Sequence, residues 1–393
     1  MSSIKLKGSS SGDVTITVPA AAGTNTVTIP ALTGTLPLSN LDHVTNRQNA
    51  KPLVINGDMA VAQRGTSTTG ITGGGYYTVD RMKVDLNDNG TWTHTQDTDV
   101  PTGQGFAKSW KLDNTTADTS VASGSYHLAR YLFEGQDLQL LKKGTSSAEK
   151  VTVSFWIKAT VTGTYIAELF DVDNSRQISQ AYTVSSANTW EKKVLSFAGD
   201  TSGALGDDNG SSFAINFWLG AGSDFSSGTL STTWTSSTNA NRAVGQVNSG
   251  SSTSNNVYFT GLQMEVGEYD STTIPPFQHE SFGDSLMRCE RYCKAIIKEA
   301  NYAPVMLAHG VTADVCRGAY FFQTPMRAAP SFTHTGNIIR SYEAATALSS
   351  ATAVSSRFAH SIDWTGSGLF AANEGILITF NTTAASLIYD AEL

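Results

Sequence analysis

The chain has 393 residues, of which only 15% are charged, and its formal net charge is −8. This composition argues against a nucleic-acid partner, because no basic stripe is present to displace counterions from a phosphate backbone. No stretch reaches the ~20 apolar residues of a membrane span, and no apolar segment typical of a signal peptide follows Met1, so we expect no membrane insertion.

The overall composition favours an all-β protein of two or three domains. Gly, Ser and Thr are abundant and strong helix formers rarely occur in runs, which is typical of short strands joined by polar turns. The three cysteines are Cys289, Cys293 and Cys316. An odd and small number of cysteines does not form a disulfide framework.

Residues 1–50 form a distinct N-terminal segment. Two similar pieces, 14–19 and 27–30, alternate apolar residues with threonines, and a turn around Gly23 lies between them. We therefore predict a β-hairpin with one apolar face. A two-stranded hairpin is only marginally stable alone, so it should dock on copies of itself or on another protein. The alternative is a flexible tail with residual β propensity.

Residues 51–283 are predicted to form a jelly-roll β-sandwich, because short alternating segments are separated by turn signals such as Asn-Gly. The predicted strands are 77–86, 91–96, 107–113, 126–133, 151–158, 164–171, 189–197, 213–219 and 257–266.

Two of these strands carry an apolar face and a mixed face. In 151–158, Trp156 and Lys158 lie opposite the apolar residues, and in 213–219, Trp218 and Asn216 do the same. Tryptophan rings stack on the C–H faces of sugars, while amides and charged groups bond the hydroxyls. We therefore predict a carbohydrate-binding platform of Trp156, Lys158, Asn216 and Trp218. The alternative is that both tryptophans pack beneath loops or against a neighbouring subunit.

The stretch 256–294 marks a change of module. It passes from strand-like alternation through Pro275-Pro276 to a helix-like spacing of Leu286, Cys289 and Cys293. We predict a short linking helix with Asp284 as its N-cap. Residues 284–393 then give further strand signals and are predicted to form a small C-terminal β-sandwich.

The motifs of common catalytic sites are missing. The sequence has no GxSxG, P-loop, HExxH or CxxC motif, and its seven histidines are scattered singly. A glycosidase needs two carboxylates across a cleft, and Glu134, Glu168 and Glu265 are the strand carboxylates available. Hydrolysis stays an alternative, and we expect a protein that is not an enzyme.

A structural calcium ion is the one cofactor that the sequence suggests. Asp58 follows the Asn-Gly of the first strand-like segment, and Glu265 lies in the last strand of the same domain. Hard cations take carboxylate and carbonyl oxygens, so these two residues could share Ca²⁺. We expect no other cofactor.

Several stretches together resemble tail-fibre and receptor-binding proteins of tailed bacteriophages. They are INGDMAVAQRG (55–65), VTVSFWIKATVTGTY (151–165), YFTGLQMEVG (258–267), SLMRCERYCKA (285–295) and FQTPMRAAPSFT (322–333). The middle region is also similar to the jelly rolls of carbohydrate-binding modules, and 12–36 resembles a segment of phage virion proteins. The resemblance implies a trimeric component of the phage tail that displays β-sandwiches towards host glycans.

The resulting hypothesis is a non-enzymatic tail fibre that attaches the virion to host surface polysaccharide. Residues 1–50 would join it to other tail proteins and 284–393 would contact the host. One alternative is a tail adaptor or decoration protein that binds only virion proteins. A second is a tailspike that hydrolyses or deacetylates glycan.

Overall fold

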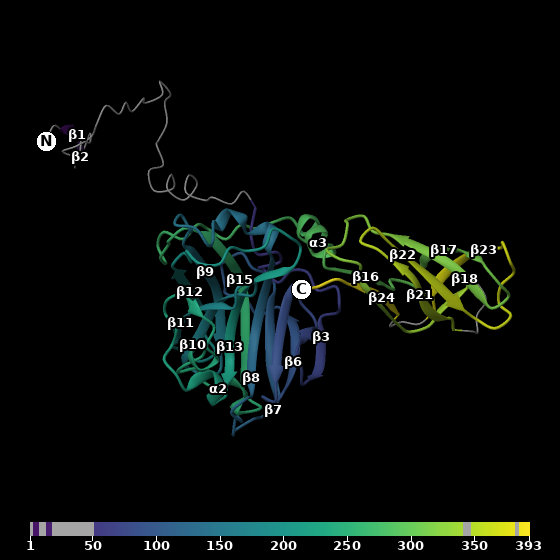
Figure 1. Ribbon diagram of the computed structural model, residues 1–393, viewed down its shortest axis with the longest axis horizontal. Helices are drawn as coiled ribbons and strands as arrows, with labels where there is room; N and C mark the ends of the chain where they lie inside the picture. The colour runs from purple at the N-terminus through teal and green to yellow at the C-terminus, as the bar shows by residue number, and fades with distance from the viewer. Residues whose placement is uncertain (1–2, 8–12, 18–50, 341–346, 382–384) are drawn as a thin grey trace. The chain divides into compact units, whose positions relative to one another are not determined.

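The computed structural model describes residues 3–7, 13–17, 51–340, 347–381 and 385–393. The chain divides into two compact units, residues 1–42 and 43–393 (Figure 1). In the first unit, β1 (Ser3–Lys7) pairs antiparallel with β2 (Asp13–Thr17). The strand predicted from residue 14 therefore forms, but its partner precedes it in the chain. The predicted partner 27–30 lies outside the described residues.

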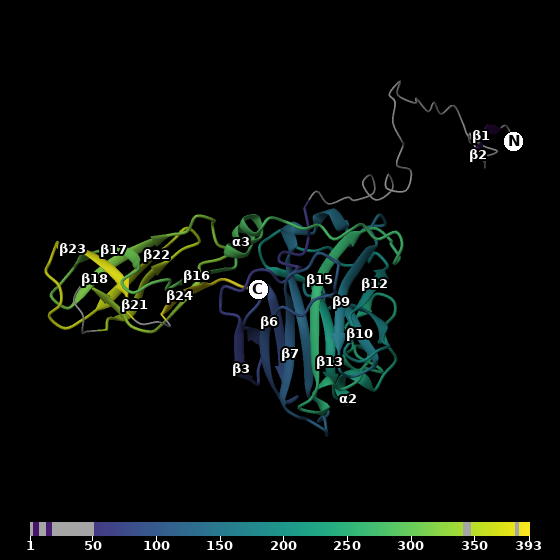
Figure 2. The ribbon, with the colours of Figure 1, turned by 180° about the vertical axis from the view of Figure 1, so that it is seen from behind.

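The second unit begins with two antiparallel sheets packed as a sandwich (Figure 1). The seven-stranded sheet has the order β14 (Thr235–Ser236), β11 (Arg176–Val184), β10 (Gly163–Asp171), β13 (Ser211–Ala221), β8 (Tyr126–Glu134), β5 (Met82–Asn87) and β4 (Gly75–Tyr76). The six-stranded sheet has the order β12 (Glu191–Phe197), β9 (Val151–Ala159), β15 (Asn256–Val266), β7 (Ser109–Thr116), β6 (Thr91–Asp97) and β3 (Ser67–Ile71), which can be followed across Figure 2. Short helical turns lie in the connections: η1 (Gly135–Asp137), η2 (Gln139–Leu141), α2 (Ser223–Ser226), η3 (Asn239–Asn241) and η4 (Ser249–Ser251).

The core of this sandwich consists of the inward faces of both sheets. Phe155 of β9 contacts Phe217 of β13, with ring centroids 4.6 Å apart, and Phe217 lies 5.1 Å from Phe259 of β15. All three rings are buried. The apolar residues that alternate along these strands therefore meet between the sheets, and the prediction of an all-β fold is confirmed.

One predicted strand of this sandwich is broken in the structure, and four strands, β3, β4, β11 and β14, were not predicted. The predicted strand 77–86 is broken before Met82, because Arg81 adopts a positive φ of 70° that a ladder does not accommodate. Strand β11 is the longest of the strands that were not predicted. Its polar residues Gln177 and Ser179 are buried, so the strand does not show the alternation of buried apolar and exposed polar residues from which strands were predicted.

Helix α3 (Phe282–Glu290) follows the proline linker, as expected, but its cap is different. The Ser281 hydroxyl, not Asp284, caps the helix by accepting the N–H of Asp284 at 3.2 Å. Asp284 lies in the first turn, where its negative charge interacts favourably with the positive end of the helix dipole. The helix ends before Cys293, which already belongs to a strand. No helix in the described part of the chain is long and apolar enough to span a membrane.

The remaining strands form a second, smaller sandwich. A three-stranded sheet has the order β16 (Cys293–Ile297), β24 (Ser386–Asp390) and β19 (Ser331–Thr335). A six-stranded sheet has the order β20 (Ile338–Arg340), β23 (Gly375–Phe380), β17 (Pro304–Gly310), β18 (Val315–Phe321), β22 (Ala359–Thr365) and β21 (Ser349–Ser355). Buried residues of both sheets, including Trp364, Ile378 and Leu387, form its core.

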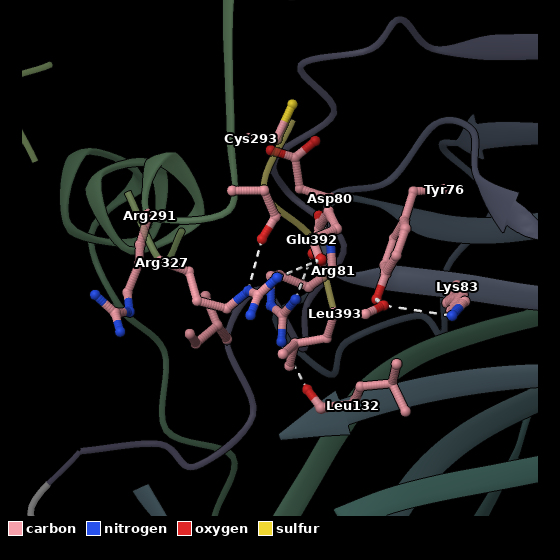
Figure 3. Close-up of polar contacts among 12 residues, drawn as sticks. Tyr76, Asp80, Arg81, Lys83, Leu132, Arg291, Cys293, Arg327, Glu392 and Leu393 are labelled. Carbon is pink, nitrogen blue, oxygen red and sulfur yellow. Dashed lines mark hydrogen bonds and ion pairs between the residues drawn. The ribbon is translucent and has the colours of Figure 1, made fainter. Parts of the chain in front are cut away.

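Buried ion pairs connect the end of the chain to the first sandwich (Figure 3). Arg81 pairs with Glu392, and both side chains are almost wholly buried. The Arg81 guanidinium lies 3.5 Å from the centroid of the Tyr292 ring. Arg64 pairs with Asp390 at 2.7 Å and lies 3.4 Å from Glu392. Removing charged groups from water is costly unless they are paired. Here Arg64 and Arg81 supply the counter-charges of Asp390 and Glu392.

Removal of the Glu392 charge should destabilise the protein. In Glu392→Gln, the buried Arg81 cation loses its counter-charge, and we expect the free energy of unfolding to fall by about 3 kcal/mol. Glu268→Gln is the control, because Glu268 and its partner Lys150 are 63% and 51% exposed, and exposed pairs contribute less than about 1 kcal/mol. Denaturant unfolding measures both. Equal losses in the two variants would contradict the role of Glu392.

The buried Asp80 carboxyl predicts a pH dependence. Desolvation raises its pKa to about 6, although Arg64 and hydrogen bonds from Gln63 favour the charged form. The folded protein therefore holds this proton at pH values where the unfolded chain has lost it. The resulting stabilisation is present at low pH and is lost as the pH rises through about 6.

Asp80→Asn should remove this contribution. We expect the difference in unfolding free energy between wild type and variant to decline as the pH rises from 4 to 7, as followed by denaturant titrations at several pH values. A difference that is constant or grows over this window would show that Asp80 is already ionised in the folded protein at low pH.

Candidate functional site

The outer face of the six-stranded sheet of the first sandwich gathers aromatic and charged side chains. Lys158 of β9 is directly opposite Tyr258 of β15, which is in turn opposite Lys111 of β7. Trp156 lies two residues before Lys158, and its cross-strand partner on β12 is Lys192. Since directly opposed residues share a face, these side chains lie on one surface, which we call the aromatic face.

Tyr258 is the centre of the aromatic face. Trp190, just before β12, contacts it edge-on, with ring centroids 6.0 Å apart. The ammonium groups of Lys158 and Lys111 lie 4.9 and 5.7 Å from the centroid of the same ring. Cations in this position are attracted to the negative face of an aromatic ring, so the two lysines hold Tyr258 in a defined orientation.

Asp99 provides a hydrogen-bond acceptor on the aromatic face. Its carboxylate accepts a hydrogen bond from Trp190 Nε1 at 2.9 Å and forms an ion pair with Lys158. Desolvation opposes ionisation of Asp99, but the hydrogen bonds from Lys158 and Trp190 together outweigh it, so the pKa of Asp99 lies below its ordinary value. The carboxylate is 39% exposed. It is therefore a charged acceptor, held by protein donors and still accessible.

A bulge in β15 extends the aromatic face. Gly261 has a φ of +63°, and a Cβ atom there would lie 2.6 Å from Phe106 and 3.1 Å from Trp156. Both rings thus rest on the glycine backbone. The Phe106 ring in turn contacts the rings of Phe277 and His279, with centroid distances of 5.1 and 5.4 Å. The glycine is required because a side chain would displace these rings.

The structure does not bring the four predicted platform residues together. Trp156 and Lys158 lie on the aromatic face, but Trp218 and Asn216 belong to β13 in the opposite sheet. Trp218 is fully buried and contacts Phe225 of α2 at a centroid distance of 5.4 Å. A sugar-binding role for these residues stays a prediction. Only Trp156 and Lys158 have exposed surface with which to fulfil it.

Asn216 and Trp218 contribute to a buried polar network instead. Glu168 accepts two hydrogen bonds from Arg242, at 2.7 and 2.9 Å, and one from the Asn216 amide at 2.8 Å. Trp218 Nε1 lies 3.3 Å from the same carboxylate. The segment that carries α2 and Arg242 folds over β13 and covers its outer face. Trp218 therefore packs beneath a covering segment, as in the alternative expected from the sequence.

The proposed calcium ligands are not part of a metal-binding cluster. Glu265 is 2% exposed, on β15, and Asp58 is half-buried in the loop before β3. Within the described residues, no group of three or more His, Cys, Asp or Glu side chains could hold a metal ion. A shared calcium ion at Asp58 and Glu265 stays a prediction.

Two of the three strand carboxylates considered for catalysis are held by arginines. Arg291 donates to both oxygens of Glu134, at 2.7 and 2.6 Å, as Arg242 does to Glu168. Burial alone would raise the pKa of Glu134, but the bonds from Arg291 bring it below its ordinary value. A glycosidase acid requires the opposite shift. These two glutamates are therefore suited to hold the fold together.

Sequence reasoning missed Trp190, Tyr258, Lys111 and Asp99. Tyr258 follows Val257 in an alternating strand, so its outward direction could have been inferred. Trp190 and Asp99 lie outside regular strands, before β12 and after β6. Only the order of strands β12, β9, β15, β7 and β6 in one sheet brings them together.

The sequence matches no protein-family model and no curated protein. Among solved structures, the enzymatically active domain of tailspike protein 4 from bacteriophage CBA120 is 14% identical, with a TM-score of 0.29, over 55% of this chain and 21% of that one. A family 4 carbohydrate-binding module is 14% identical, with a TM-score of 0.24, over 56% of this chain and 97% of that one. A putative sugar-binding protein from Bacteroides thetaiotaomicron is 11% identical, with a TM-score of 0.29, over 55% of this chain and all of that one. The chain thus spans about a fifth of the tailspike. These values are too low to carry a conclusion about this chain.

Burial predicts that Trp218 is a stability residue. Trp218→Ala should lower the free energy of unfolding by about 3–5 kcal/mol, because it leaves a cavity beneath α2 and removes a buried ring. Trp156→Ala, the control, should cost distinctly less, since Trp156 is partly exposed. Denaturant unfolding monitored by circular dichroism measures both. A loss in Trp218→Ala no larger than in Trp156→Ala would contradict this assignment.

Proposed function

We propose that this chain is a non-enzymatic bacteriophage tail-fibre protein that attaches the virion to host surface polysaccharide through the aromatic face. The observation that carries the proposal is the grouping of Trp156, Trp190 and Tyr258 with paired lysine and aspartate side chains on one sheet surface. The bacteriophage context rests on the resemblance of the sequence.

The chemistry of the aromatic face suits a carbohydrate. The rings of Trp156 and Trp190 offer apolar surface for the C–H faces of a sugar, while Asp99 accepts hydrogen bonds from hydroxyl groups and Lys158 donates to ring or carboxylate oxygens. The contacts of Asp99 with Trp190 and Lys158 are already made. Little side-chain entropy would then be lost on binding.

Assembly would multiply a weak contact. We propose that the chain forms a homotrimer in the phage tail, that residues 1–50 join it to other tail proteins, and that 284–393 form its distal part. Three copies of the aromatic face on one fibre would convert modest affinity into avidity. The sequence resemblance supports this arrangement.

The proposal is of binding without cleavage. Support comes from Glu134, which accepts two hydrogen bonds from Arg291 and has a pKa below its ordinary value, whereas a catalytic acid needs a raised pKa. Glu168 likewise accepts two hydrogen bonds from Arg242. Asp99, the carboxylate of the aromatic face, has a pKa below its ordinary value. A general acid for glycoside hydrolysis would need the reverse.

Loss of the two partly exposed tryptophans of the aromatic face should weaken binding. For the double variant Trp156→Ala and Trp190→Ala, we expect at least about tenfold weaker binding to the glycan that the wild type selects from an array of bacterial surface polysaccharides, about 1.4 kcal/mol. Tyr302→Ala is the control, because Tyr302 is 40% exposed but lies outside the aromatic face.

The same polysaccharide can be used to test whether the protein has hydrolase or esterase activity. After prolonged incubation with the wild type, its chain length and acetyl content should be unchanged. New reducing ends or released acetate would contradict the proposal, as would an unaltered affinity in a folded double variant.

A further inference from the structure

A groove along the edge strand β12 continues the aromatic face. One side of the groove consists of residues 192–196 of β12, and the other side is the loop that follows β15. The loop residues that line it are Glu268, Tyr269, Asp270, Ser271 and Thr273. Because Lys192 is directly opposite Trp156, the groove meets the aromatic face at its Lys192 end.

The loop beside the groove is fixed to the sheet by hydrogen bonds. The Tyr269 N–H donates to the Thr152 hydroxyl at 3.0 Å, and this hydroxyl donates to the Gly267 carbonyl at 2.9 Å. The Gln263 amide donates to the Pro275 carbonyl at 3.1 Å. The groove is therefore formed before any ligand enters it.

Lys192 differs from the other two lysines of the aromatic face in having no carboxylate partner. Lys158 pairs with Asp99, and Lys111 lies 3.5 Å from Asp113. In the described part of the chain, no acidic side chain pairs with Lys192. Partial desolvation lowers the pKa of its ammonium group, with no neighbouring carboxylate to oppose the shift. A cation in this position gains from an anion supplied by a ligand.

Two further charged side chains that line the groove have partners within the protein. Lys193 pairs with Glu191 at 2.6 Å, and Glu268 pairs with Lys150. Their charges are thus compensated locally, and they leave the Lys192 ammonium as the cation of the groove that is free to bind a ligand.

Asp270 lies at the far end of the groove from Lys192. It follows Tyr269, which bonds to the residue opposite Ser196. Four strand residues separate the backbones of Lys192 and Ser196 by about 13 Å, which exceeds the screening length of ~8 Å at physiological ionic strength. Asp270 also accepts four hydrogen bonds within its own turn. An anion at Lys192 would therefore meet little repulsion from Asp270.

The groups at the junction of the groove and the aromatic face suit an acidic sugar. The partly exposed Trp156 ring can stack on the C–H face of a sugar. Directly opposed residues have Cβ atoms about 4.5–5.5 Å apart, so a sugar on Trp156 presents its substituents to Lys192. An ammonium group donates hydrogen bonds and accepts none. A carboxylate is the sugar substituent that gains most from it, because charge-assisted hydrogen bonds are stronger than neutral ones.

We propose that Lys192, at the mouth of this groove, makes the protein select polysaccharides that carry carboxylate groups, as those built with uronic acids do. The inference rests on the proposed function and names the class of glycan that the aromatic face binds. The net charge of −8 repels a polyanion at long range. A preference for acidic glycans would therefore report a local contact.

Paired glycans test the proposal on the full chain. An array carries neutral bacterial surface polysaccharides and others that contain uronic acids, each of the latter beside its carboxyl-reduced form, in which every carboxylate has become a primary alcohol. We expect the wild type to select an acidic polysaccharide and to bind it about tenfold more tightly than its reduced form, the factor that one hydrogen bond to a charged group provides.

Three variants separate the charge of Lys192 from the rest of the site. Lys192→Gln should bind the acidic form about tenfold more weakly and the reduced form as the wild type does. Lys192→Arg keeps the charge and should keep the preference. Lys142→Gln is the control, because it removes the same charge from a side chain that is 53% exposed and lies outside the aromatic face and the groove.

Several results would overturn the inference. They are equal binding of the acidic and reduced forms by the wild type, a preference that persists in Lys192→Gln, an equal loss for both forms in that variant, and a loss in Lys142→Gln as large as in Lys192→Gln.

Failure of this inference is distinguishable from failure of the proposed function. Selection of a polysaccharide without carboxylates would overturn the inference alone. The double variant Trp156→Ala and Trp190→Ala should bind both forms more weakly, and unaltered affinity there would contradict the aromatic face as the binding site. A wild type that binds no glycan of the array would overturn the proposed function and this inference with it.

Discussion

Each sheet of the two sandwiches has an inner face that packs in a core and an outer face. Whether the chain covers the outer face or leaves it exposed determines whether that face is available to bind a partner. The inner faces pair to form the two cores, as Phe155 and Phe217 do in the first sandwich. The outer faces of the first sandwich have two different outcomes. One is covered by the chain itself, and the other carries an organised set of aromatic and charged groups. Both functional proposals concern the second face.

Three buried glutamates of this fold are each paired with an arginine. Glu392 pairs with Arg81, Glu134 with Arg291 and Glu168 with Arg242. Since a desolvated carboxylate is costly unless its lone pairs are satisfied, each pair ties together segments that are distant in the chain. The carboxylates are thereby committed to structure, whereas Asp99 stays partly exposed and available to a ligand.

The alternation of apolar residues allowed the sandwich and most of its strands to be predicted. It also correctly placed Trp156 and Lys158 on an outer face. It also placed Trp218 on the outer face of its sheet, but it did not show that this face is covered, because the period of a strand shows which residues share a face and not whether another segment packs on it. The N-cap of α3 was misplaced for a related reason: Ser281 and Asp284 are both good caps, and the path of the chain after the prolines selects Ser281.

The sequence by itself determined the all-β class, the inward faces and the absence of common catalytic motifs, since these depend on local periodicity and residue type. Only the tertiary structure decided which strands are neighbours. The pairing of β9 with β12 and β15 brings Trp156, Trp190 and Tyr258 to one surface, and the register of β9 with β12 sets Lys192 opposite Trp156. Register between distant strands is set by the packing of the whole core, so no local pattern encodes it.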